Sequence, residues 1–164
     1  MKFCLLGFFF GMGVFLVFIS KLLFYAYGMG AKYDFTGISG HAFRSAFLFP
    51  LLAWICVKGK SKKWQYVSVV IAIIISLLIS SLRYYFSFHT LLELLAGLGL
   101  GGVLSMAAIK VFNSIVCEKF HLSVYFYILG IFVVIIALNI THVPTVRWLR
   151  ELATWITGQP FYRR

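Results

Sequence analysis

Acidic side chains are scarce in this chain. Its 164 residues contain four carboxylates, at Asp34, Glu93, Glu118 and Glu151, against fifteen lysines and arginines, so the formal net charge is +11. In a water-soluble protein this excess would suggest a nucleic-acid partner. Here the basic residues lie mostly in loops between apolar stretches, where topology signals and anionic lipid head groups explain them better. We therefore expect a membrane partner and no nucleic acid.

Cysteine is also sparse. Cys4, Cys56 and Cys117 lie far apart in the sequence and form no C-x-x-C pair. This spacing argues against a disulfide framework and against a zinc site built from cysteines. We interpret the cysteines as small packing residues.

Apolar residues make up 62% of the chain, whereas soluble domains contain roughly 45–50%. A helix that crosses a bilayer needs about 20 consecutive residues of this kind. The first apolar stretch resembles a signal peptide, but no small-residue cleavage site follows it, and we interpret it as a retained span. The sequence thus predicts an all-α integral membrane protein, a single domain over residues 1–164 with about five transmembrane helices. The expected spans are residues 3–27, 41–57, 64–82, 89–111 and 122–140.

The tail, residues 144–157, is too short and too charged to cross a membrane. Its apolar side chains share one helical face: Trp148, Leu152, Trp155 and Ile156. Its polar side chains share another: Arg147, Arg150, Glu151 and Thr154. This pattern favours an amphipathic helix that lies in the head-group layer. A helix that packs on its own bundle is the alternative.

Two further patterns concern topology and packing. The short loop at residues 58–63, "KGKSKK", carries four lysines and therefore predicts a cytoplasmic loop. Two G-x-x-x-G pairs, Gly7 with Gly11 and Gly97 with Gly101, allow helix backbones to approach closely. For both pairs we favour packing within the bundle over a dimer interface.

One short segment holds charged residues where charge is expensive. In "SLRYYFSFHTLLELLAG", residues 81–97, Arg83 is followed by His89 and then by Glu93. His89 and Glu93 are four residues apart at the start of a helix, so we expect them to be in contact. A carboxylate beside an imidazole fixes its tautomer and raises its basicity, which suits a nucleophile or a base. Arg83 is suited to binding an anion with two hydrogen bonds.

A second polar segment, "GISGHAFRS" at residues 37–45, stands where a loop becomes a helix. Backbone N–H groups at such a helix start favour an anion. Ser39 and Gly40 are placed to bind phosphate oxygens, His41 to act as an acid, and Arg44 follows one turn later on roughly the same face. One span precedes this segment and three precede the other, so both are expected at the same membrane surface.

The sequence Ser39-Gly40-His41, followed by Arg83-x5-His89-x3-Glu93, resembles the type 2 phosphatidic acid phosphatase family of membrane lipid phosphatases. The usual motifs of that family are K-x6-R-P, P-S-G-H and S-R-x5-H-x3-D, and the resemblance covers about residues 21–97. It implies that His89 is a nucleophile that forms a phosphohistidine, that Glu93 orients it, and that His41 is the general acid. It assigns phosphate binding to Ser39, Gly40 and Arg83, with Lys21 from the first motif. It also implies a reaction without metal or other cofactor.

The chain departs from these motifs at several positions. Ile38 replaces the proline before Ser39, Leu82 replaces the serine before the arginine, and Glu93 stands in place of an aspartate. The first motif differs most, because Gly28 and Met29 stand where the family has Arg-Pro. One phosphate-binding cation is therefore missing.

Our hypothesis is that Arg44 or Lys32 takes the place of the missing arginine. The chain also has one predicted span before the Ser39 segment, where the family commonly has three, and it adds the span at residues 122–140. It therefore resembles a minimal or divergent member.

The expected function is hydrolysis of a membrane lipid phosphate or pyrophosphate at the extracytoplasmic surface, with a polyprenyl pyrophosphate or a phospholipid phosphate as substrate. The expected location is a bacterial inner membrane, with the site facing the periplasm or outside. Two alternatives stay open. One is transfer of the phosphoryl group to another lipid, and the other is a non-catalytic protein that binds lipid phosphate or a membrane partner.

Overall fold

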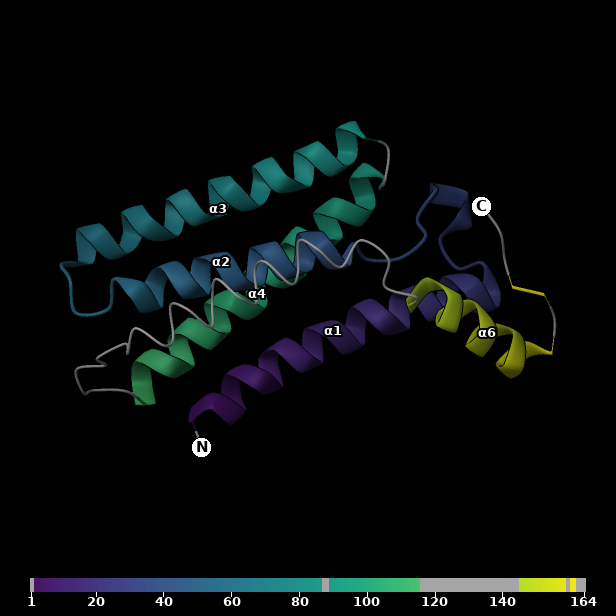
Figure 1. Cartoon of the computed structure of the whole chain (residues 1–164), viewed down its shortest axis with the longest axis horizontal. Coiled ribbons are helices and arrows are strands. Elements are labelled where there is room, and N and C mark those ends of the chain that lie inside the picture. The colour runs from purple at the N-terminus through teal and green to yellow at the C-terminus, as the bar shows by residue number, and fades with distance from the viewer. Residues whose placement is uncertain (1, 87–88, 116–144, 159, 162–164) are drawn as a thin grey trace.

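The computed structural model of the chain describes residues 2–86, 89–115, 145–158 and 160–161 (Figure 1). Within these ranges the chain is helical and contains no strand. The elements are α1 (Lys2–Tyr27), the 3-10 turn η1 (Ala31–Tyr33), α2 (Gly40–Cys56), α3 (Lys62–Tyr85), α4 (Leu91–Ile115) and α6 (Thr145–Thr157). The first four predicted spans and the predicted tail helix are thus confirmed as helices, within a few residues at each end. The fifth predicted span, residues 122–140, lies outside the described residues.

Three of the described helices are long and apolar enough to cross a membrane: Leu6–Tyr27, Lys62–Tyr85 and Leu91–Val111. Their outer faces expose large apolar side chains. On α3, for example, Val70, Ile71, Ile74 and Leu78 are each half exposed or more. An apolar surface of this extent is unfavourable in water and suits the hydrocarbon of a bilayer. The arrangement therefore supports a chain embedded in a membrane.

Helix α2 is the centre of the bundle. It packs most extensively against α4 and α3, and nine of its seventeen residues are buried. The core contains Phe43, Phe47, Leu51 and Trp54 from this helix. Helix α2 is apolar around most of its circumference and has no single hydrophobic face. This pattern suits a helix that neighbours cover on several sides. It is also shorter than the three helices that could span.

Two glycines bring α2 and α4 together. A Cβ atom on Gly97 would lie 2.6 Å from the carbonyl oxygen of Ser39, and one on Gly101 would lie 2.5 Å from that of Phe43. Only glycine permits backbones to approach this closely, so the predicted internal packing of this pair is confirmed. For Gly7 and Gly11 it is wrong among the described residues, because a Cβ atom on either would meet nothing within 4 Å.

Helix α6 packs beside the C-terminal part of α1 (Figure 1). Its inner face buries Leu149 and Ala153, and the guanidinium of Arg150 lies over the ring of Tyr25, 5.4 Å from its centroid. The opposite face leaves Trp148 and Trp155 exposed. The alternative of packing on the bundle is therefore confirmed for one face, while the predicted apolar face remains uncovered by the described residues.

Candidate functional site

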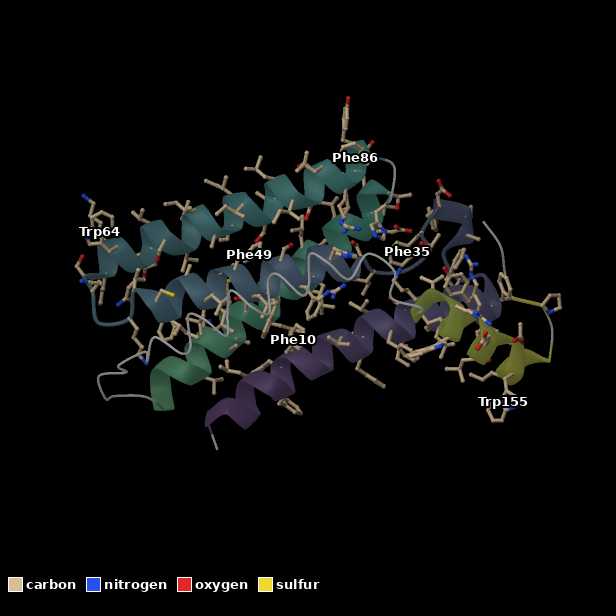
Figure 2. All side chains as sticks on the ribbon, viewed as in Figure 1. Phe10, Phe35, Phe49, Trp64, Phe86 and Trp155 are labelled. Atoms are coloured by element: carbon tan, nitrogen blue, oxygen red, sulfur yellow. The ribbon has the colours of Figure 1, made fainter. Side chains whose placement is uncertain are left out.

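The two polar segments meet in the structure. The backbone N–H of Ser39, just before α2, donates to the backbone oxygen of Glu93 in the first turn of α4, at 3.1 Å. Figure 2 places Phe35 and Phe86, which lie close to the two segments in sequence, toward one end of the bundle and Trp64 toward the other. The predicted convergence of residues from two loops on one surface is thus confirmed.

Glu93 connects the two segments through hydrogen bonds of its carboxylate. Its side chain is buried, with 1% of its surface exposed. One carboxylate oxygen, Oε1, accepts the backbone N–H of Thr36 at 2.7 Å and also the Thr36 hydroxyl. The other, Oε2, lies 2.7 Å from Nδ1 of His89 and accepts the backbone N–H of Thr90 at 3.3 Å. A buried carboxylate is tolerated because it is hydrogen-bonded in this way.

The contact between His89 and Glu93 confirms the sequence prediction, but its cause is different. Helix α4 begins at Leu91, so His89 stands before the helix and not within its first turn. Glu93 reaches back because it forms a capping box with Thr90: the Glu93 backbone N–H donates to Thr90 Oγ1 at 3.5 Å, while Glu93 Oε2 accepts the Thr90 N–H. The T-x-x-E pattern at residues 90–93 is the sequence signal for this arrangement.

The same contact favours one tautomer of His89. When Nδ1 carries the proton and donates to the ionised Glu93, the lone pair of the imidazole is on Nε2. The His89 side chain keeps 15% of its surface exposed, in contrast to its buried partner. The arrangement therefore holds one ring nitrogen in place and leaves the ring partly accessible.

The loop before α2 is fixed from two directions. The N–H of Ile38 donates to Ser20 Oγ on α1 at 2.9 Å, opposite the bonds that Thr36 and Ser39 make to Glu93. Gly37 has a φ of 120°, and a Cβ atom there would lie 2.9 Å from Cα of Lys21. Both the backbone conformation and the lack of space therefore require glycine at this position.

Ser39 and Gly40 stand at the start of α2, as predicted. The Ser39 side chain is fully buried and caps the helix, because its Oγ accepts the N–H of Ala42 at 3.5 Å. Its hydroxyl thus has a structural role besides the predicted one in phosphate binding. The oxygen of Gly40 accepts a hydrogen bond from Nε of Arg44 at 3.1 Å, which draws the guanidinium back over the start of the helix.

The predicted cations gather around His41. The charges of Arg83, Arg44, His89 and Lys21 all act on this imidazole. Lys21 also interacts electrostatically with Glu93, and Arg83 with Arg44. Three basic side chains, Arg83, Arg44 and Lys21, thus act on one imidazole, and such an electropositive site suits a ligand with more than one negative charge.

Two residues of the loop before α2 differ from what the sequence indicated. Lys32 is exposed, with its ammonium 6.0 Å from the centroid of the Tyr33 ring, and it is not among the charges that act on His41. Of the two candidates for the missing cation, Arg44 is therefore the one whose charge acts on His41. Thr36 was missed, because a threonine in a glycine-rich loop carries no local signal that it contacts a carboxylate 57 residues away.

Comparison with known proteins finds a partial match to a bacterial protein. No protein-family model matches the chain, and no solved structure matches it. A stretch of 93 residues is 31% identical to a Klebsiella pneumoniae protein described as an uncharacterized 22.5 kDa protein in the cps region. The match covers 56% of this chain and 44% of that protein, so the chain spans less than half the length of this relative. The description of the relative states no activity.

Proposed function

We propose that this chain hydrolyses a membrane lipid phosphate or pyrophosphate through a phosphohistidine, as a divergent relative of the type 2 phosphatidic acid phosphatases. One observation carries the proposal: His89 contacts a buried carboxylate at 2.7 Å beside a second histidine, His41, on which the charges of three basic side chains act. A nucleophile with an orienting carboxylate, a separate acid and an electropositive surrounding are the components that phosphoryl transfer needs.

The proposed steps are those that the family resemblance implies. Nε2 of His89 attacks phosphorus, the bond from nitrogen to phosphorus forms, and the bond to the leaving lipid oxygen breaks while His41 gives that oxygen a proton. Burial and the neighbouring cations lower the pKa of His41, so this imidazole carries the proton once the negative charge of the bound phosphate offsets those cations. Water then attacks the phosphohistidine, His41 takes its proton, and the bond from phosphorus to Nε2 breaks, which releases phosphate. Arg83, Arg44 and Lys21 stabilise the charge on the phosphoryl oxygens throughout.

The surroundings support a lipid as the substrate. The helices that carry the site expose apolar side chains along their outer faces, among them Leu91, Leu92 and Leu95 on α4. A long-chain lipid can keep its tail in the bilayer while its head group reaches the site. A polyprenyl pyrophosphate or a phospholipid phosphate fits this description.

Topology supports a site on the extracytoplasmic side of a bacterial inner membrane. The segment with four lysines, residues 58–63, covers the loop between α2 and α3 and the first two residues of α3, at the ends opposite to those that carry the site. Short loops rich in lysine stay in the cytoplasm. The exposed tryptophans of α6, which packs near the end of α1, fit the proposed role of this helix in the head-group layer.

The experiment is phosphate release by the purified protein in detergent, against a panel of lipid phosphates and pyrophosphates, with EDTA present. His89→Ala is the test variant and Lys32→Ala, which removes an exposed loop charge, is the matched control. We expect release that survives EDTA, persists in the control and disappears in the His89 variant. No release by a folded wild-type protein would refute hydrolysis. Transfer to an added acceptor lipid would then indicate a phosphotransferase, and lipid-phosphate binding without turnover a binding protein.

A further inference from the structure

The carboxylate of Glu93 is held by both of its oxygens, and the two sets of partners differ. Oε2 faces its own segment, where His89 and the N–H of Thr90 contact it. Oε1 faces the loop before α2, where both donors of Thr36, the backbone N–H and the hydroxyl, converge on it. One residue of a distant loop therefore supplies both of the hydrogen bonds that the structure gives to this oxygen.

A glutamate needs this second contact. Its terminal torsion is broad and roughly two-fold, so a carboxylate held by one oxygen can rotate about the bond to that end. Rotation would change the direction in which Oε2 meets Nδ1 of His89, and the imidazole ring would turn with it. Donors that fix Oε1 prevent the rotation because the carboxylate plane is then defined at two points.

The loop that carries Thr36 also leads to His41. Ser39, between them, donates its N–H to the backbone oxygen of Glu93 at 3.1 Å. The loop is thus attached to Glu93 at two points. Thr36 binds the side-chain carboxylate of Glu93, and Ser39 binds its backbone oxygen. Glu93 therefore contacts both His89 and Ser39, the residue that precedes α2 and its His41.

We propose that Thr36 is a positioning residue that acts through Glu93: it fixes the carboxylate that orients the nucleophile His89 and holds the loop that presents the acid His41. This role rests on the proposed function, because His89 is a nucleophile only if the chain transfers a phosphoryl group. The contact of Thr36 with Glu93 implies no direct contact with the substrate. Loss of its hydroxyl leaves the backbone N–H as the one Thr36 donor to Oε1, so the carboxylate is held less firmly. We expect this loss to slow the chemical step without weakening substrate binding.

The kinetic test compares Thr36→Val, which keeps the shape and removes the hydroxyl, with Thr36→Ser, which keeps the hydroxyl. We expect kcat to fall by about 10–100-fold in the valine variant, the range seen when a residue that orients a functional group is removed. KM should change by less than about two-fold, because uniform binding is not affected. Serine should restore most of kcat. Thr154→Val, on the distant helix α6, is the matched control and should behave as wild type.

A second measurement does not depend on activity. In protein labelled with 15N-histidine, the proton on Nδ1 of His89 should give a far-downfield NMR signal, identified by its loss in His89→Gln. We expect the signal to persist in Thr36→Ser and in the Thr154 control, and to shift or disappear through exchange in Thr36→Val. Thr36→Ala serves the same purpose if the valine variant does not fold.

The outcomes separate the two proposals. A valine variant that keeps both the wild-type kcat and the Nδ1 signal overturns the role of Thr36 while the phosphatase activity stands. A wild-type protein that releases no phosphate overturns the proposed function. The NMR comparison then still decides whether Thr36 positions His89.

Discussion

Replacing Gly97 with alanine should move the segment around Ser39 away from Glu93 at the start of α4. A Cβ atom at this position would lie 2.6 Å from the carbonyl oxygen of Ser39, whereas ordinary contacts begin at 3.4 Å. The obstacle is backbone, which cannot turn away as a side chain does. Helices α4 and α2 must therefore move apart locally by about 0.8 Å, the difference between these two distances.

The effect on the site follows from this displacement. The hydrogen bond from the Ser39 N–H to the Glu93 oxygen measures 3.1 Å. If Ser39 moves away from α4 by the full amount, this distance increases to about 3.9 Å, which is too long for a hydrogen bond. Overpacking of a close interface costs about 1–3 kcal/mol, and the lost hydrogen bond adds about 0.5–1.5 kcal/mol.

Gly99 and Gly102 on the same helix provide matched controls. Within the part of the chain that the structure describes, a Cβ atom at either position would meet nothing within 4 Å. In a helix, alanine is more favourable than glycine by about 0.8–1.0 kcal/mol. These variants should therefore be neutral or slightly more stable, while Gly97→Ala should lose about 1–4 kcal/mol in its free energy of unfolding.

The assay is reversible unfolding in mixed detergent micelles, followed by circular dichroism, together with phosphate release for each variant. Gly97→Ala should unfold at a lower denaturant concentration than the controls and lose activity. A Gly97→Ala protein as stable and as active as Gly99→Ala would refute the close approach of α2 and α4, and with it the way in which the two segments are brought together.

Two further predictions concern the cations and the tail helix. Arg44→Ala should lower kcat/KM by about 10–100-fold, the value of a charged hydrogen bond to phosphate, while Lys32→Ala should match wild type; full turnover without Arg44 would refute its role as the replacement cation. In a variant that keeps Trp155 as its only tryptophan, lipids brominated near the head group should quench the fluorescence more strongly than lipids brominated at the chain end, and equal or no quenching would place α6 outside the head-group layer.

Much of the fold was predictable because the relevant signals are local. Long apolar runs mark helices whatever surrounds them, and the helices observed over Lys2–Tyr27, Lys62–Tyr85 and Leu91–Ile115 agree with runs visible in the sequence. The contact of His89 with Glu93 is also local, since it joins residues four apart. Proximity in sequence was sufficient even though the contact depends on a helix cap and not on a helical turn.

Contacts between distant segments were less predictable. The two G-x-x-x-G pairs look alike in sequence, yet Gly97 and Gly101 touch the α2 backbone while Gly7 and Gly11 have no described residue close to where a Cβ atom would lie. Which face of a helix meets a neighbour depends on the packing of all the helices together. The inner face of α6, with Leu149 and Ala153, could not be derived for the same reason.

The sequence by itself determined the helical class of this protein, the approximate ends of its helices and the residue types of its candidate site, because run length, spacing and charge are properties of the chain. The tertiary structure decided that the charge of Arg44 and not that of Lys32 acts on His41, and that Thr36 holds the carboxylate of Glu93 across 57 residues. A hydrogen bond between distant segments exists only once the helices have packed, and no local pattern encodes it.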